Sequence, residues 1–233
     1  SLHDALPISR NMKEASMVEG ISVIGVRKLE EAIYAINNEV SEGCSYVFTS
    51  EHSKTREDCD YSDIKGQEYA KRALIIAAAG KHPLLMIGPP GCGKTMLVKR
   101  MPTILPPITK NELLESTIIH SVAGQLNKGD NDLISRPFRA PHHTISRAAL
   151  LGGGLYPMPG ELSLAHNGVL FLDEFCEFDT GQIEALRQPL EDHKIVISRQ
   201  GTTYEFPCKS LVVMAANPCP CGFFGSESTE CTC

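Results

Sequence analysis

Gly88-Pro-Pro-Gly-Cys-Gly-Lys-Thr95 directly follows the apolar run Pro83-Leu-Leu-Met-Ile87. A short strand followed by a glycine-rich turn that opens a helix is typical of a phosphate-binding loop. Glycines let the backbone curl so that successive N–H groups face phosphate oxygens at the positive end of the helix. The alternative is a chance Gly/Pro turn, but it requires every fixed position to coincide. We therefore expect an α/β fold with a nucleotide site at this loop.

The last two residues of the loop have expected roles in binding the nucleotide and its metal ion. Lys94 would reach the β- and γ-phosphates, and the Thr95 hydroxyl would hold Mg²⁺. Cys92 occupies a variable position without a neighbouring base, so it is not expected to act as a nucleophile. The residues expected to contact the nucleotide are Gly88, Pro89, Pro90, Gly91, Cys92, Gly93, Lys94, Thr95 and Met96.

A second strand, fully buried, is predicted at residues 169–172, with two acids directly behind it. Ligands of open α/β sheets collect at the carboxyl ends of strands. Asp173 would hold Mg²⁺ through its water shell, and Glu174 would polarise the water that attacks the γ-phosphate. A solvated strand end is the alternative explanation of these acids, and the phosphate loop upstream argues against it.

A third apolar run, residues 210–216, ends in Asn217-Pro218. Taken alone, Asn-Pro is an ordinary turn. Beside the two other strands it predicts that Asn217 lies at the same sheet edge, where it would position the attacking water or report the γ-phosphate.

These three elements resemble the Walker A, Walker B and sensor 1 motifs of AAA+ ATPases. Further stretches closely resemble the bacterial ComM/YifB branch of magnesium-chelatase-like proteins, and these are residues 63–67, 136–146, 159–168, 186–192 and 217–222. The resemblance implies a three-layer P-loop core with a parallel central sheet, and ATP and Mg²⁺ as cofactors. It gives catalytic roles to Lys94, Glu174 and Asn217. It also implies a homo-hexameric motor that acts on DNA in natural transformation.

The resemblance also implies a domain order. Residues 1–11 have no counterpart and are an unassigned or non-native leader, and residues 12–50 resemble the end of a Lon-protease-like α+β domain. Residues 51–60 form a charged linker, and residues 61–233 form the AAA+ core without its lid subdomain. Because the arginine finger and second sensor belong to other elements of such proteins, we expect this fragment to bind nucleotide better than it hydrolyses it.

Composition agrees with a globular protein of the cytoplasm. The 233 residues are 42% hydrophobic and 21% charged, which suits one core plus a remnant. The apolar runs are too short to cross a membrane. Nine cysteines beside a phosphate loop favour reduced thiols over a disulfide scaffold.

Four arginines are candidates for DNA contact. The net charge of −6 means that such contact needs a local basic patch. The interval between Lys94 and Asp173 is longer than a strand-helix-strand unit needs, and this insertion holds Arg136, Arg139 and Arg147 in a stretch without acids. Arg199 lies in the turn of a predicted hairpin, residues 194–206. The alternatives are a solvated basic loop, an edge hairpin whose charges keep it soluble, and arginines that face a neighbouring subunit's phosphate. His142 and His143 are not expected to bind metal, because adjacent side chains usually point apart.

Four cysteines close the chain in two Cys-x-Cys pairs, and these are Cys219, Cys221, Cys231 and Cys233. Four thiolates suit structural Zn²⁺, although Cys-x-Cys is tighter than the usual zinc spacing, and free thiols in a surface loop are the alternative.

Two other functional classes stay open from the sequence. One is a chelatase-type motor that drives metal insertion through a partner enzyme. The other is a nucleotide- or zinc-dependent interaction module without turnover.

Overall fold

The computed structural model of the chain describes residues 4–5, 11–18, 20–37, 60–126, 135–199, 201–225 and 230–233. The described helices are α1 (Met12–Ala15), α2 (Leu29–Asn37), α3 (Glu68–Gly80), α4 (Lys94–Lys99), α5 (Lys110–Val122), α6 (Arg147–Leu151), α7 (Glu161–Leu164) and α8 (Thr180–Asp192), with short 3-10 turns at Tyr61–Asp63, Met101–Thr103 and Phe175–Glu177. The described strands are β1 (Asp4–Ala5), β2 (Ser22–Val23), β3 (Leu84–Ile87), β4 (Phe138–Arg139), β5 (Gly152–Gly153), β6 (Met158–Pro159), β7 (Val169–Leu172), β8 (Lys194–Arg199), β9 (Thr202–Pro207) and β10 (Leu211–Ala216).

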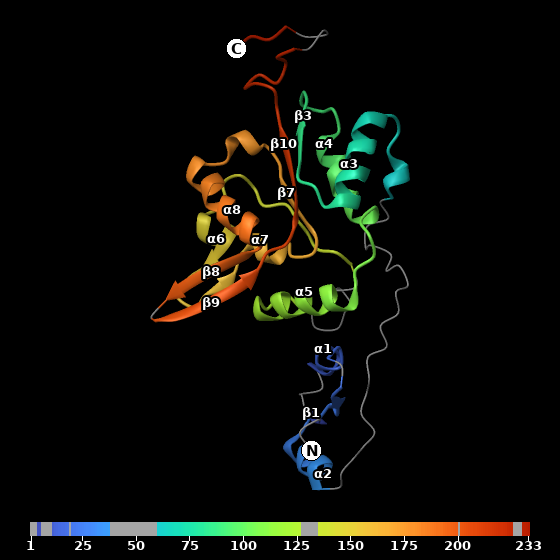
Figure 1. Ribbon diagram of the computed structural model, residues 1–233, viewed down its shortest axis with the longest axis vertical. Helices are drawn as coiled ribbons and strands as arrows, with labels where there is room; N and C mark the ends of the chain where they lie inside the picture. The colour runs from blue at the N-terminus through green and yellow to red at the C-terminus, as the bar shows by residue number, and fades with distance from the viewer. Residues whose placement is uncertain are drawn as a thin grey trace.

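The centre of the molecule is a parallel sheet of four strands in the order β3-β10-β7-β4 (Figure 1). Its strands are nonconsecutive in the chain, so each crossover must pass through helices on the faces of the sheet. All four residues of β7 are buried, as expected for a strand covered on both faces. Because the strands are parallel, the segments that follow them meet at one edge.

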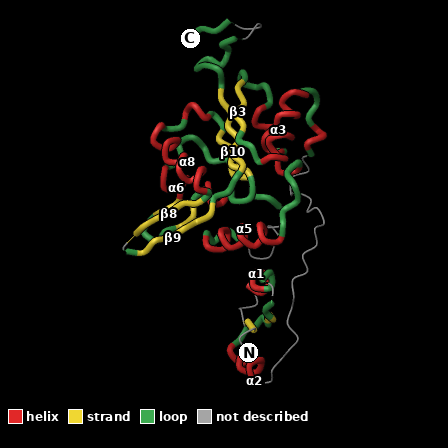
Figure 2. The backbone as a smooth tube through the Cα atoms, in the orientation of Figure 1, coloured by secondary structure: helices red, strands yellow, loops and turns green. Residues whose placement is uncertain are grey.

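Side chains of the central strands alternate between two cores. Val169 and Phe171 pack with α3 and α4 on one face, whereas Leu170 and Leu172 pack with α6, α7 and α8 on the other. Figure 2 shows the same division, with helices on both sides of the yellow strands. The predicted three-layer α/β fold is therefore confirmed.

The start of α5 and the end of α8 show how local sequence sets helix length. Thr109 and Glu112 form a reciprocal capping box at the start of α5. Proline often ends a helix, but α8 contains Pro189 and continues to Asp192. Pro189 removes one backbone hydrogen bond near the end of α8, but the helix continues past it, and Leu190 packs against the core.

The amino-terminal segment contains both helix and strand. Its longest described helix is α2 (Leu29–Asn37), and its strand β2 is short, at Ser22–Val23. In Figures 1 and 2 this segment is drawn apart from the central sheet. The linker expected at residues 51–60 lies outside the described residues apart from its last position, and the domain boundaries stay a prediction. Within the described residues, every helix is too short or too polar to cross a membrane.

Candidate nucleotide-binding site

The glycine-rich loop connects β3 to α4 at the carboxyl edge of the sheet. Gly88 N–H donates to the Ala216 carbonyl of the neighbouring strand at 3.3 Å, which anchors the start of the loop. Gly91 and Gly93 have φ of +77° and +89°, a region that side chains rarely adopt. A Cβ on Gly91 would meet no atom within 4 Å, so the loop faces open space there. This curled, open backbone fits a phosphate group.

Lys94 connects the loop to the predicted sensor strand. Its Nζ donates to the carbonyls of Gly88 at 2.6 Å and Pro89 at 3.0 Å, and to Asn217 Oδ1 at 3.2 Å. Lys94 and Asn217 are 123 positions apart in the chain, and parallel pairing of β3 with β10 brings them together. A cation is thus held beside the loop that would receive phosphate.

Thr95 and Asp173 form the second contact across the site. Thr95 Oγ1, in the first turn of α4, donates at 2.7 Å to Asp173 Oδ2, which directly follows β7. Asp173 Oδ1 also accepts the Glu174 N–H at 3.0 Å. A hydroxyl and a carboxylate side by side are the oxygen donors that Mg²⁺ prefers. The residues present therefore fit a magnesium ion bound with nucleotide phosphates.

Glu174 has an unusual backbone and a partner that the sequence did not reveal. Its φ of +52° is rare outside glycine and is often found at functional sites. Its Oε2 lies 3.2 Å from His143 Nδ1, and its side chain is 55% exposed. The histidine rings of His142 and His143 lie 4.1 Å apart, so these side chains do not point away from each other as expected. Only the pairing of β4 with β7 could have indicated that His143 would reach Glu174.

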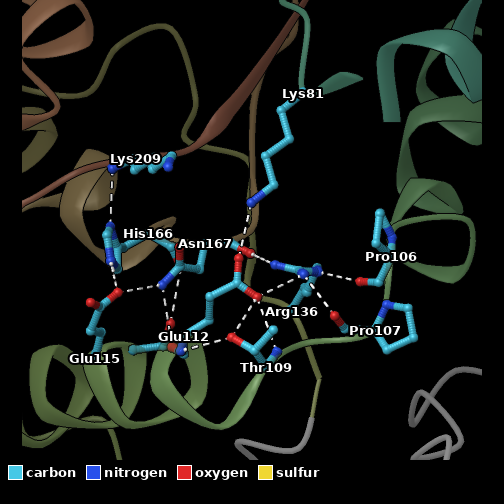
Figure 3. Close-up of polar contacts among 11 residues, drawn as sticks. Lys81, Pro106, Pro107, Thr109, Glu112, Glu115, Arg136, His166, Asn167 and Lys209 are labelled. Atoms are coloured by element: carbon cyan, nitrogen blue, oxygen red, sulfur yellow. Dashed lines mark hydrogen bonds and ion pairs between the residues drawn. The ribbon is translucent and has the colours of Figure 1, made fainter. Parts of the chain in front are cut away.

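Arg136 is not available for DNA contact, which corrects the sequence-based expectation (Figure 3). Its side chain is only 6% exposed. The guanidinium donates to the carbonyls of Pro106 at 2.6 Å, Asn167 at 2.7 Å and Pro107 at 3.0 Å, and pairs with Glu112 at 2.9 Å. Every arm of the guanidinium is therefore used inside the protein.

The partners of Arg136 form a polar network before the strands begin, at the sheet edge opposite the glycine-rich loop. Burial raises the pKa of Glu112, but the Thr109 N–H, Lys81 and Arg136 outweigh it and hold that pKa at about 2. Burial lowers the pKa of His166, so its ring is neutral at pH 7. A neutral ring can accept the Lys209 N–H at Nδ1 and donate from Nε2 to the Glu115 carboxylate, and the contacts fit this tautomer (Figure 3).

The other predicted DNA contacts differ in accessibility. Arg139 makes two 2.6 Å contacts with the Glu161 carboxylate, so its charge is largely compensated. Arg147 is exposed at the start of α6, and Arg199 is exposed at the end of β8. These two keep the accessibility that contact with a nucleic acid needs.

The four terminal cysteines meet in space. All four Sγ atoms lie within 4.8 Å of one another. The cluster follows β10 and Asn217, so it lies just beyond the edge that holds the glycine-rich loop (Figure 1).

The fold and the site together define an α/β protein with a P-loop of the AAA+ type. The chain matches the family model "Magnesium chelatase, subunit ChlI" over residues 60–233, and it belongs to that family. It is 42% identical over 228 residues to the competence protein ComM of Haemophilus influenzae, covering 96% of this chain and 44% of that protein. It is 47% identical over 173 residues to the uncharacterized protein YifB of Escherichia coli, covering 74% and 34%.

A solved structure agrees with the fold. The cryo-EM-based model of the complex between subunits BchI and BchD of magnesium chelatase has a TM-score of 0.51 at 22% identity, and the match covers 68% of this chain and 54% of that chain. The predicted relationship to ComM and YifB is confirmed by the sequence matches. The chain spans less than half the length of these two curated relatives.

Proposed function

We propose that this chain is the nucleotide-binding core of an ATP-driven motor that converts ATP and water to ADP and phosphate. The observation that carries the proposal is the convergence of Lys94, Thr95, Asp173 and Asn217 at one sheet edge, joined by two direct contacts of 3.2 and 2.7 Å. The cofactors proposed are ATP and Mg²⁺ at this site, with Zn²⁺ at the cluster of four cysteines. The proposed location is the cytoplasm.

Each residue of the site has a distinct part in this reaction. Lys94 would neutralise phosphate charge, and Asn217, which already accepts a hydrogen bond from it, would orient the terminal phosphate or the water. Mg²⁺, when bound, offsets the negative charge of the phosphates, and Thr95 and Asp173 would hold it. Glu174 would accept a proton from the attacking water.

His143 adds a positioning role. Its ring contacts the Glu174 carboxylate at 3.2 Å and packs edge-on against Phe178. A carboxylate held by a neighbouring ring keeps one orientation toward the water more often than a free one. We therefore assign His143 to the orientation of Glu174 rather than to proton transfer.

We further propose that the whole protein is a homo-hexameric motor that moves along DNA. Support comes from one relative, the competence protein ComM, and from the β8–β9 hairpin, which projects away from the sheet in Figure 1. Arg199 is exposed in this hairpin, and Arg147 is exposed at the start of α6. The remaining candidate, Arg139, is paired with Glu161 and is a weaker choice.

A chelatase-type motor is the second candidate function. The family name and the structural likeness to magnesium chelatase subunits favour it. It shares the ATPase chemistry and differs in what the motor drives.

The test is ATP turnover by the full-length hexamer with and without forked DNA. A DNA motor requires DNA-stimulated turnover that falls when Arg199 becomes Gln and does not fall when the helix residue Arg187 becomes Gln. Arg187 is a matched control because it is 83% exposed on α8. A turnover rate that is unchanged by DNA but raised by a porphyrin-metallating partner would support the chelatase-type motor. The absence of turnover in the assembled ring would support an interaction module.

A further inference from the structure

The four terminal thiols have the spacing of metal ligands. Cys219 Sγ lies 3.4 Å from Cys221 Sγ and 3.8 Å from Cys231 Sγ, and the last two are 3.6 Å apart. A tetrahedral zinc site with Zn–S bonds of about 2.3 Å separates its sulfurs by about 3.8 Å. A disulfide needs about 2.05 Å, so these contacts are too long for covalent bonds.

Hydrophobic packing does not explain why the thiols meet. Three of the four cysteines are half-buried and Cys233 is exposed, and none belongs to either core of the sheet. Backbone N–H groups point at the sulfurs instead: Phe224 N–H donates to Cys219 at 3.3 Å, and Cys221 N–H donates to Cys233 at 3.2 Å. Outer hydrogen bonds of this kind orient thiolate ligands and reduce the cost of gathering negative sulfurs.

The cluster also touches the glycine-rich loop. Gly222 has φ of +84°, and its N–H closes a tight turn by donating to the Cys219 carbonyl at 2.9 Å. A Cβ on Gly222 would lie 2.6 Å from Pro90 Cδ and 3.2 Å from Pro90 Cγ. The backbone of the cysteine turn therefore rests directly on a residue of the phosphate-binding loop. Asn217, the predicted sensor, is only two positions before the first cysteine.

We infer that one Zn²⁺, bound by Cys219, Cys221, Cys231 and Cys233, holds the cysteine turn against Pro90 and so keeps the phosphate-binding loop in its binding conformation. The zinc site is inferred from the cysteine cluster and does not depend on the proposed nucleotide site. The effect on the loop does rest on the proposed nucleotide site. The zinc is structural, because four protein ligands leave no open position for substrate.

The metal site is tested on the full 233-residue chain, purified under reducing conditions without added metal. We expect one zinc per chain by mass spectrometry of the metal content, lost in the Cys219→Ser/Cys231→Ser double variant and kept in Cys176→Ser, which removes an exposed cysteine outside the cluster. If the double variant fails to fold, the metal site can still be tested by adding Co²⁺ to the metal-free wild type and recording its absorption spectrum. Tetrahedral thiolate coordination gives intense charge-transfer absorption. A wild type without zinc and without that absorption overturns the inference.

The link to the loop is tested with two glycine variants. Gly222→Ala places a methyl group against Pro90, whereas Gly225→Ala has a similar backbone, φ +76°, and no atom within 4 Å of the new methyl. We expect both to keep zinc, and only Gly222→Ala to weaken binding of a fluorescent ATP analogue, by about tenfold, because a displaced loop misaligns its phosphate donors. Equal affinities for the two variants would overturn the link.

These readouts separate the inference from the proposed function. Zinc content and cobalt absorption do not depend on nucleotide binding. A chain that holds zinc but never binds nucleotide contradicts the proposed ATPase and the link to the loop, and leaves the metal site standing. A chain that binds nucleotide equally with and without zinc contradicts the link alone.

Discussion

Replacing Arg136 with Met should destabilise the fold strongly while leaving the nucleotide site chemically intact. The variant removes three hydrogen bonds to carbonyls and the pairing with Glu112, whose side chain is only 18% exposed. Loss of one partner of a buried ion pair costs about 3–5 kcal/mol, because the other charge stays buried without compensation. Lys81 and the Thr109 N–H still contact Glu112, so we expect the lower end of that range.

Urea unfolding followed by circular dichroism measures this loss directly. A cost of about 3 kcal/mol corresponds to a melting temperature lower by about 6–12 °C for a domain of this size. Arg136→Lys should be destabilised as well, since an ammonium cannot reach three carbonyls and a carboxylate in the geometry of a guanidinium. Arg187→Met is the control: this arginine pairs with Glu191 on the surface, and its loss should change stability by less than about 0.5 kcal/mol. A loss below about 1 kcal/mol for Arg136→Met would refute the assigned structural role.

Three further outcomes follow from the same contacts. Stability should fall on acidification below pH 6.5, because the pKa of His166 is lower in the folded state than in the unfolded chain. It should fall again below pH 4.5, because Glu112 becomes protonated in the unfolded chain while its folded pKa is about 2. Unfolding midpoints across pH 3–8 check this, and a flat profile contradicts it. His143→Ala should lower kcat of the full-length ATPase by about tenfold with little change in nucleotide affinity, whereas an unchanged kcat would remove its positioning role. Arg139→Gln should lower the melting temperature more than Arg199→Gln, since only Arg139 is paired twice with a carboxylate.

The sequence was sufficient to predict the positions of site residues that directly follow a predicted strand. Lys94 and Thr95 stand in one contiguous motif, and Asp173 follows an unbroken apolar strand, so the parallel sheet brings them to one edge with no further information. The continuous apolar run of β7 likewise predicted a strand buried on both faces.

The failures have a common physical cause, which is a contact between residues distant in the chain. The local sequence around Arg136 contains no acid, so it does not distinguish a solvent-exposed side chain from one that pairs with Glu112, 24 positions upstream. His143 reaches Glu174 only because β4 pairs with β7. The contact of Gly222 with Pro90 depends on a positive φ and on parallel pairing of β3 with β10, neither of which has a sequence pattern of its own.

Binding and turnover of Mg-ATP by three matched proteins decide whether the glycine-rich loop is a nucleotide site. Titration of a fluorescent ATP analogue should show binding by the wild-type chain, loss of binding in Lys94→Ala, and retained binding in Glu174→Gln. In the full-length protein, Glu174→Gln should abolish turnover. If Lys94→Ala binds Mg-ATP as tightly as the wild type, the glycine-rich loop is not the nucleotide site and the account is wrong.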